Sequence, residues 1–213
     1  MVSVLLLLAG SSQRMNSKIN KVFLPLGDKP VYAHSLELFL KFGLEVICVV
    51  KEGEEHHLKP YVPLIKIVNG GNTRQESVYR GLCAAKGDQI LIHDAARPHL
   101  KEQTLQDCLS ALKEEKAVLV GCFCKDTIYH RNPLAVLNRQ ELFQAQTPQG
   151  GPKEALIKAY RQAMKENVSA TDDLSLLLKY SPMEVSLIDG TDQNFKITTQ
   201  LDYILSKEMM KNV

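Results

Sequence analysis

Short, continuous apolar runs alternate along the chain with segments in which apolar residues recur every three or four positions. Residues 2–9 (VSVLLLLA) and 89–93 (QILIH) have the length and composition of buried β-strands. Between them, Tyr32, Leu36 and Phe39 repeat at helical spacing after a proline suited to the first turn of a helix. The same patterns predict further strands at 44–50, 64–68, 117–124, 184–188 and 194–197, and further helices capped by Asn72 and at about 105–112, 152–165, 172–179 and 199–210.

This alternation of strands and helices is typical of an α/β layer sandwich with a mostly parallel sheet. In such sheets ligands bind at the carboxyl ends of the strands. Residues 128–138 lose the periodicity and contain Pro133, so they are interpreted as an excursion from the core. No internal repeat or linker divides the chain, and a single domain spanning residues 1–213 is expected.

Composition narrows the class of protein. Hydrophobic residues make up 45% of the 213 residues and charged residues 23%, which excludes a disordered chain. The net charge of +2 argues against a surface that binds duplex nucleic acid, but it leaves room for a local basic pocket. The apolar run at 4–9 is too short to cross a membrane and no basic stretch precedes it, so neither a membrane partner nor a secretory signal is expected. The five cysteines are an odd count without a CxxC pair, which is typical of reduced thiols in a cytoplasmic protein.

The loop after the first strand, LAGSSQRMNSKINK, combines small residues with cations. Backbone N–H groups at Gly10 and Ser11 can cradle phosphates, and Arg14 and Lys21 suit a reaction that gathers negative charge on phosphorus. Neither the P-loop spacing nor the GxGxxG fingerprint is present. The alternative interpretation is a small-residue turn with exposed basic side chains.

Two further loops follow predicted strands. Gly70 and Gly71 allow the backbone to approach a flat base closely, with Ser77 on the helix that follows, although an ordinary strand–turn–helix junction would look similar. In IHDAARP, Asp94 ends a buried strand and Arg97 follows three residues later. A Mg²⁺ site would explain a carboxylate in this place, with Arg97 gripping a phosphate. The alternative is a structural Asp94–Arg97 ion pair.

The remaining candidates are weaker on their own. Thr171 is a suitable N-cap for a helix that begins with two aspartates, and a cap requires no further function. Lys196 is a cation on a short predicted strand, and His93 is expected to pack or hydrogen-bond inside the protein.

Taken together and in order, these segments resemble the 2-C-methyl-D-erythritol 4-phosphate cytidylyltransferase family of isoprenoid biosynthesis. The resemblance runs over nearly the whole chain and rests on AGSSQRM with Lys21, FLPLGDKPV, GGNTRQESVYRGL, LIHDAARP, KDT, NRQELFQAQTPQ, ATDD and NFKIT. Ribitol-5-phosphate cytidylyltransferases share most of these segments. The sequence departs from the family pattern at Asn20, where proline is usual, and at Ser12, where a second glycine is frequent.

The resemblance implies a Rossmann-like nucleotidyltransferase fold, a three-layer sandwich with a β-arm at about 125–147 that is exchanged within a homodimer. It implies transfer of CMP from CTP to a polyol phosphate, with release of pyrophosphate and with Mg²⁺, or Mn²⁺, as the cofactor. The implied catalytic residues are Arg14 and Lys21, and Asp94 is the implied metal ligand. The implied CTP-binding residues are Ala9, Gly10, Ser11, Gly70, Gly71 and Ser77, and the implied acceptor-binding residues are Asp94, Arg97, Thr127, Arg139, Thr147, Thr171 and Lys196.

Two other functions stay open at this stage. The first keeps the chemistry but changes the acceptor to ribitol 5-phosphate or a sugar phosphate. The second is a nucleotide-binding module that no longer catalyses, whose expected mark is the loss of Arg14, Lys21 or Asp94. None of these residues is lost.

Overall fold

A seven-stranded sheet forms the centre of the protein, whose computed structural model describes residues 1–10 and 19–211. The strand order is β11-β7-β10-β6-β1-β4-β5. Four strand pairs are parallel, and the two pairs made by β10 are antiparallel, so the predicted mostly parallel sheet is confirmed. The strands span Val2–Leu7 (β1), Glu45–Val50 (β4), Lys66–Asn69 (β5), Gln89–Asp94 (β6), Ala117–Phe123 (β7), Phe143–Pro152 (β10) and Val185–Asp189 (β11).

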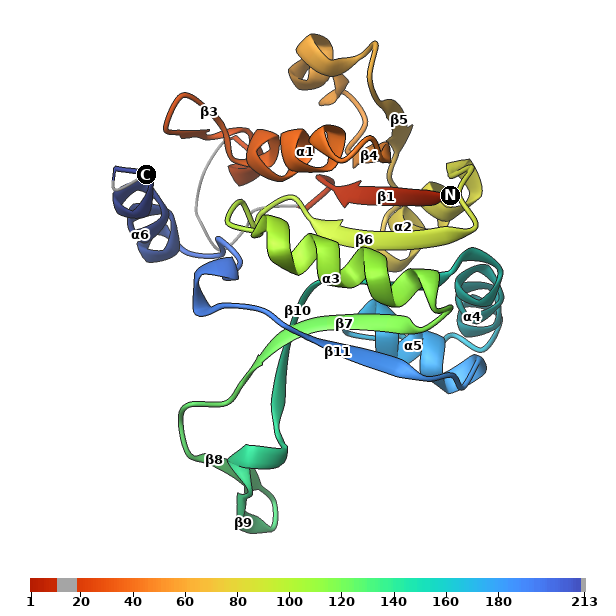
Figure 1. Cartoon of the computed structure of the whole chain (residues 1–213), viewed down its shortest axis with the longest axis vertical. Coiled ribbons are helices and arrows are strands. Elements are labelled where there is room, and N and C mark those ends of the chain that lie inside the picture. The colour runs from red at the N-terminus through yellow and green to blue at the C-terminus, as the bar shows by residue number, and fades with distance from the viewer. Residues whose placement is uncertain (11–18, 212–213) are drawn as a thin grey trace.

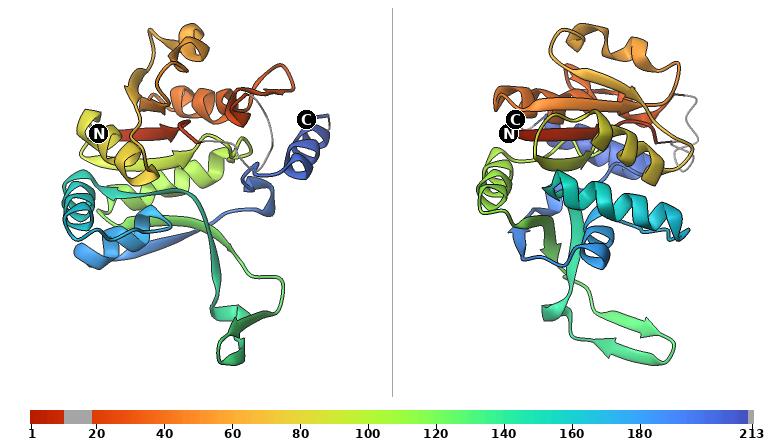
Figure 2. Two further views of the ribbon diagram at one scale, coloured as in Figure 1. Left: turned by 180° about the vertical axis from the view of Figure 1, so that it is seen from behind. Right: turned by 90° about the vertical axis from the view of Figure 1, so that its right-hand side faces the viewer.

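Helices cover both faces of this sheet and complete the predicted three layers (Figures 1 and 2). Alternate side chains of β1 show the division, because Val4 and Leu6 belong to one core cluster and Leu5 to the other. The first cluster includes side chains of α1 (Val31–Lys41) and α3 (Glu102–Lys113). The second includes side chains of α2 (Arg74–Ala84), α4 (Lys153–Lys165) and α5 (Asp173–Tyr180).

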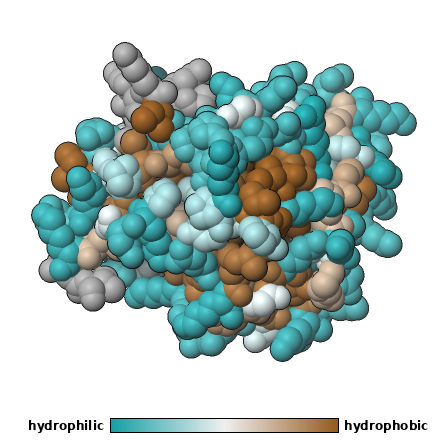
Figure 3. All heavy atoms as spheres, turned by 90° about the horizontal axis from the view of Figure 1, so that it is seen from above, coloured by the Kyte–Doolittle hydropathy of each residue, from teal (hydrophilic) through white to brown (hydrophobic). Residues whose placement is uncertain are grey.

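The C-terminal helix α6 (Gln200–Met210) packs beside the body through a third, small cluster with Leu26, Val31 and Ile197. Short elements connect the layers: β2 (Pro25–Leu26), β3 (Lys29–Pro30), and the 3-10 turns η2 (Lys21–Phe23), η3 (Glu55–Tyr61), η4 (Arg139–Glu141) and η5 (Asp192–Asn194). Seen from the end that carries η3, most of the surface is hydrophilic, with apolar patches between (Figure 3). Among the residues that the structure describes, no helix has both the length and the apolar character needed to cross a membrane.

A hairpin arm projects from the body between β7 and β10 (Figure 1). It consists of β8 (Ile128–Arg131) and β9 (Leu134–Leu137), which pair with each other and form a separate two-stranded sheet. The projecting part is shorter than the predicted 125–147, because β10 begins at Phe143 and pairs there with Phe123. Residues 143–147 therefore belong to the central sheet.

The predicted and observed elements differ at four places. β10 forms in a segment for which no strand was predicted. Residues 194–197 were predicted to form a short strand, but they form the end of a 3-10 turn and irregular chain. Helix α2 is capped by Thr73, which accepts from the Glu76 N–H, and not by Asn72. Helix α5 is capped by Asp172, which accepts from the Ser175 N–H, and not by Thr171. Both caps are displaced by one residue, a shift that spacing alone does not settle.

His93, on β6, is fully buried. Its ring nitrogens lie 3.0 Å from Thr147 Oγ1 and 3.1 Å from the Arg97 carbonyl oxygen, which confirms that it packs inside the protein. Burial lowers the pKa of His93 from 6.5 to about 4, because the charged ring would be desolvated.

The buried His93 predicts acid sensitivity. Between about pH 6.5 and 4 the unfolded chain binds a proton that the folded protein excludes. The free energy of unfolding therefore decreases as the pH falls through this window, by on the order of 3 kcal/mol for this group. Urea denaturation at pH 7 and pH 5 measures the effect, and the His93→Gln variant is expected to lose less stability between these values than the wild type. An equal loss in both proteins would contradict the assignment.

Candidate active site

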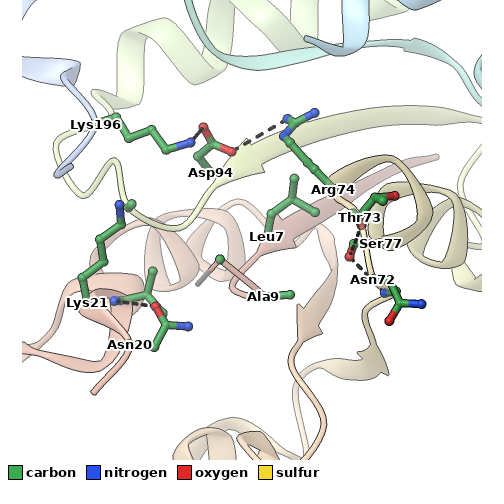
Figure 4. A pocket seen from close by; sticks show the side chains of 14 residues that line it. Leu7, Ala9, Asn20, Lys21, Asn72, Thr73, Arg74, Ser77, Asp94 and Lys196 are labelled. Atoms are coloured by element: carbon green, nitrogen blue, oxygen red, sulfur yellow. Dashed lines mark hydrogen bonds and ion pairs between the residues drawn. The ribbon is translucent and has the colours of Figure 1, made fainter. Parts of the chain in front are cut away.

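The main pocket opens at the carboxyl ends of β1 and β6, where the fold class places ligands (Figure 4). Leu7 and Asp94 are register partners at these ends, so the loops that leave the two strands start side by side. The cavity measures about 560 Å³. Its lining consists of Leu7, Ala9, Gly10, Asn20, Lys21, Val22, Gly71, Asn72, Thr73, Arg74, Ser77, Asp94, Ala96 and Lys196.

One side of the pocket is the turn between β5 and α2. The Ser77 hydroxyl accepts from the Gly71 N–H at 3.0 Å and donates to the Thr73 carbonyl at 2.8 Å, which ties the turn to the first turn of the helix. A Cβ on Gly70 would lie 2.8 Å from the Ser77 oxygen and 3.0 Å from the Ala9 Cβ. Only glycine fits between these neighbours, so Gly70 lets the turn pack closely against the β1 loop.

Asn20 and Lys21 form the opposite side. The Asn20 amide donates to the Leu8 carbonyl at 2.8 Å and to Glu54 at 3.2 Å, and this fastens the start of η2 to the end of β1. Lys21 is only 8% exposed and lines the pocket from η2. The polar Asn20, which stands where the family pattern has proline, thus holds the lysine through hydrogen bonds.

Asp94 lies at the centre of a cluster of cations. Its Oδ2 accepts from the Lys196 ammonium at 2.8 Å, while Arg97 Nε lies 3.9 Å from Oδ2 and Arg74 Nη2 lies 3.8 Å from Oδ1. Burial acts to raise the pKa of Asp94, but the attraction of Lys196 and Arg74 outweighs it and holds the pKa well below its usual range. Asp94 is therefore an ionised carboxylate throughout the neutral range.

The structure adds Arg74 to the site, a residue for which no role was predicted. Arg74 is the first residue of α2 and lines the pocket. Its guanidinium donates to both carboxylate oxygens of Asp173, at 2.7 and 2.6 Å. Burial acts to lower the pKa of Arg74, but Asp173 and Asp94 raise it further than burial lowers it, so the group stays charged. The partner residues lie 99 positions apart in the chain, and no local pattern links them.

The predicted site residues that the structure describes separate into a group at the pocket and a group away from it. The first group lines the pocket and consists of Ala9, Gly10, Lys21, Gly71, Ser77, Asp94 and Lys196, with Gly70 supporting it. Ser11 and Arg14 lie outside the described residues. The others are elsewhere: Arg97, Thr127, Arg139, Thr147 and Thr171 are not among the lining residues that the structure describes.

Each residue of the second group has an identifiable environment. Arg97 Nη1 donates to the Asn194 carbonyl at 2.7 Å, and this joins the β6 loop to η5. The Thr147 hydroxyl is buried and accepts from the Asp94 N–H at 3.2 Å, so it supports the backbone of the site. Thr171 is exposed before α5, and Thr127 precedes β8 on the arm. Arg139 lines a second hollow near the base of the arm and donates to the Lys125 carbonyl.

The electrostatics of the main pocket suit an anion. Among the residues that the structure describes, its lining includes the cations Lys21, Arg74 and Lys196 and the carboxylate Asp94. Figure 4 shows the three cations reaching the same cavity from different segments. Charges that face a partly enclosed cavity act more strongly than charges in open solvent, so the pocket favours a ligand with several negative charges.

Comparison with known proteins identifies the family. A sequence model described as 2-C-methyl-D-erythritol 4-phosphate cytidylyltransferase matches residues 2–212. Proteins of that name from Clostridioides difficile and Syntrophotalea carbinolica are 35% and 37% identical to this chain; the matches cover 99% and 98% of this chain and 94% and 96% of those proteins. The crystal structure of a 4-diphosphocytidyl-2C-methyl-D-erythritol synthase from Anaerococcus prevotii superposes with a TM-score of 0.86 at 27% identity, over 99% of this chain and 98% of that one.

The fold, the pocket and these relatives define a nucleotidyltransferase. The chain belongs to the 2-C-methyl-D-erythritol 4-phosphate cytidylyltransferase family.

Proposed function

We propose that the protein transfers CMP from CTP to 2-C-methyl-D-erythritol 4-phosphate, giving 4-diphosphocytidyl-2-C-methyl-D-erythritol and pyrophosphate. The observation that carries the proposal is the whole-chain family match together with a cationic pocket at the strand ends. In this arrangement the cytosine and ribose lie against the turn of Gly70, Gly71 and Ser77. The triphosphate lies along the loop that begins at Ala9 and Gly10.

The reaction joins two anions. An oxygen of the acceptor's phosphate attacks the α-phosphorus of CTP, the new P–O bond forms, and the bond to the oxygen that bridges the α- and β-phosphorus breaks, releasing pyrophosphate. The attacking phosphate is already ionised at neutral pH, so no strong general base is required. The protein must position the two anions and stabilise the charge that builds up on phosphorus. Lys21 and Arg14 take this second task, and Lys196 binds the acceptor phosphate beside Asp94.

The residues present fit a divalent cation that is held jointly with the nucleotide. Asp94 Oδ2 is taken by Lys196, but Oδ1 lies 3.8 Å from Arg74, beyond hydrogen-bond distance, and can accept a ligand. Among the described residues, no group of three or more His, Cys, Asp or Glu side chains gathers to hold a metal. Mg²⁺ binds one or two carboxylates and takes its other ligands from phosphates and water. We assign Mg²⁺, or Mn²⁺, to Asp94, where the ion would neutralise charge on the triphosphate.

The arm supports a homodimer. Tyr129, Leu134 and Val136 on the hairpin are 57%, 77% and 59% exposed, and the two-stranded arm has no helix packed against it in Figure 2. An isolated two-stranded hairpin is marginally stable in water, so a second copy that covers these side chains would stabilise it. We propose that the arms are exchanged between two subunits, and that Thr127 and Arg139 complete the acceptor site of the partner.

The dimer makes a testable prediction. In sedimentation velocity the wild type is expected to run as a dimer and the Leu134→Asp variant as a monomer, because a buried carboxylate would destabilise the interface. The Gln106→Asp variant, on the exposed side of α3, carries the same added charge and should stay dimeric. A wild type that runs as a monomer at every concentration up to about 100 times the assay concentration would refute the proposal.

We propose a cytoplasmic location because the cysteines are not paired in disulfides. All five cysteines are free in the structure, two of them buried, which suits a reducing compartment.

The activity is tested by pyrophosphate release. Purified protein is incubated with Mg²⁺ and CTP and with 2-C-methyl-D-erythritol 4-phosphate or ribitol 5-phosphate, with ATP, GTP and UTP in parallel. We expect release with CTP and methylerythritol phosphate. Release with ribitol phosphate alone would replace the acceptor and keep the chemistry. No release with any pair would refute the transfer reaction and favour a binding module.

A further inference from the structure

Arg74 and Asp173 form an ion pair in the wall of the pocket that the proposed mechanism does not use. The pair is bidentate, with N–O distances of 2.7 and 2.6 Å. Asp173 is fully buried, whereas the Arg74 side chain is 37% exposed and faces the cavity. One member of the pair is thus anchored in the core and the other reaches the place where a ligand binds.

Apart from Arg74, Asp173 is held from two directions. The Tyr160 hydroxyl donates to its carboxylate from α4. The Gln149 side chain, from β10, accepts from the backbone N–H groups of Asp173 and Leu174 at 3.0 and 2.9 Å. The start of α5 is therefore fixed to the sheet and to α4, and the carboxylate that grips Arg74 cannot rotate freely.

Arg74 also joins the two halves of the pocket. It follows directly on Thr73, the cap of α2, three residues before the Ser77 that fastens the glycine turn. The same Nη2 that donates to Asp173 lies 3.8 Å from Asp94 Oδ1 (Figure 4). One rigid guanidinium thus spans the distance between the nucleotide turn and the carboxylate beside Lys196.

We propose that Arg74 is a positioning residue: held by Asp173, its charge attracts the Asp94 carboxylate across 3.8 Å and orients it relative to the nucleotide turn, so that the acceptor phosphate and the α-phosphorus meet in line. The inference rests on the proposed transfer reaction and deepens it. Stability alone does not account for the pair, because a buried ion pair contributes little net stability over apolar residues of similar size. Geometry does account for it. A planar guanidinium that donates through two nitrogens has a fixed orientation, whereas a lysine ammonium is a point charge on a flexible stem.

The test compares four variants with the wild type: Arg74→Lys, Arg74→Gln, Asp173→Asn and the double variant Arg74→Gln/Asp173→Asn. Arg161→Gln on α4 is the matched control, because Arg161 is exposed, contacts Tyr79 and is not among the described residues that line the pocket. Steady-state pyrophosphate release gives kcat and both KM values. Equilibrium dialysis with labelled CTP gives its Kd without the acceptor, and thermal unfolding reports the folded state.

Arg74→Lys and Asp173→Asn are expected to lower kcat by about tenfold or more, since a misplacement of one ångström can cost about 10²-fold. The Kd for CTP should change by less than about threefold, because the glycine turn keeps its own hydrogen bonds. The double variant should be no more than about twofold worse than Arg74→Gln alone, as residues that act as one unit are not additive. Arg161→Gln should match the wild type.

Two results would overturn the inference. One is a kcat within twofold of the wild type for both folded single variants, Arg74→Lys and Asp173→Asn. The other is a loss of kcat that only follows a proportional loss of folded protein or of CTP binding, which is what a purely structural pair would give. If Arg74→Gln does not fold, Arg74→Lys and Asp173→Asn decide the matter. A wild type that releases no pyrophosphate would refute the proposed function and the inference together, whereas an active wild type with unaffected variants would refute the inference alone.

Discussion

Replacement of Lys21 by alanine is expected to lower kcat by about 10²–10³-fold, the usual cost of removing one pre-positioned donor from a site where charge develops. Lys21 lines the pocket at 8% exposure, and the hydrogen bond from Asn20 to the Leu8 carbonyl holds the start of its 3-10 turn against the end of β1. The loss should fall on kcat more than on KM for CTP, because the charge on phosphorus is greatest in the transition state.

The measurement for Lys21→Ala is steady-state pyrophosphate release with thermal unfolding alongside. Lys113→Ala, at the exposed end of α3, is the matched control and should leave both unchanged. A Lys21→Ala protein that folds and keeps a near-normal kcat would remove Lys21 from the mechanism.

Replacement of Asp94 by asparagine is expected to affect activity and stability together. The substitution removes the carboxylate that Lys196 and Arg97 face, whereas Arg74 keeps its pair with Asp173. Breaking a buried pair costs about 3–5 kcal/mol, but Lys196 and Arg74 are over one third exposed, so we expect about 1–3 kcal/mol. Activity should fall by about 10²-fold or more, because the carboxylate that orients Lys196 and the proposed cation is lost.

A second substitution separates the two effects of Asp94→Asn. In the double variant Asp94→Asn/Lys196→Met the excess positive charge is reduced, so part of the lost stability should return while activity stays low. Urea denaturation and pyrophosphate release measure the two quantities, and Asp107→Asn on the surface of α3 is the control. Recovery of activity in the double variant would show that Asp94 acts only by balancing Lys196.

Continuous apolar runs made most of the sheet predictable. The strands β1, β4, β6 and β7 are buried on both faces, and their side chains form an uninterrupted signal. β10 gave no such signal, because its sequence FQAQTPQGGP is rich in glutamine and glycine. Its buried Gln146 and Gln149 are stabilised by hydrogen bonds to distant partners, which a local pattern cannot contain. The pairing of β10 with β6 and β7 is a product of tertiary structure.

The part of the site that could be predicted consists of residues at or just after the carboxyl ends of strands. Asp94 and the glycine turn follow apolar runs, and the parallel sheet brings such ends to one edge. The contact of Arg74 with Asp173 joins residues 99 positions apart, and Lys196 meets Asp94 across 102. The sequence does indicate that Arg74 and Asp173 each begin a helix. It does not indicate that these two helices lie side by side, because that depends on the strand order.

The position of β10 in the sheet also determines when the central sheet can be completed during synthesis. β6 and β7 are successive strands of the central sheet along the chain, yet in the finished sheet β10 lies between them, and β10 is made only after the arm. During synthesis the ribosome must therefore release residues up to Pro152 before the two halves of the sheet can join. Until then the facing edges of β6 and β7 are open and able to pair with other chains. A nascent chain that stalls within the arm thus exposes two unpaired strand edges, and a chaperone that covers them would prevent pairing with other chains.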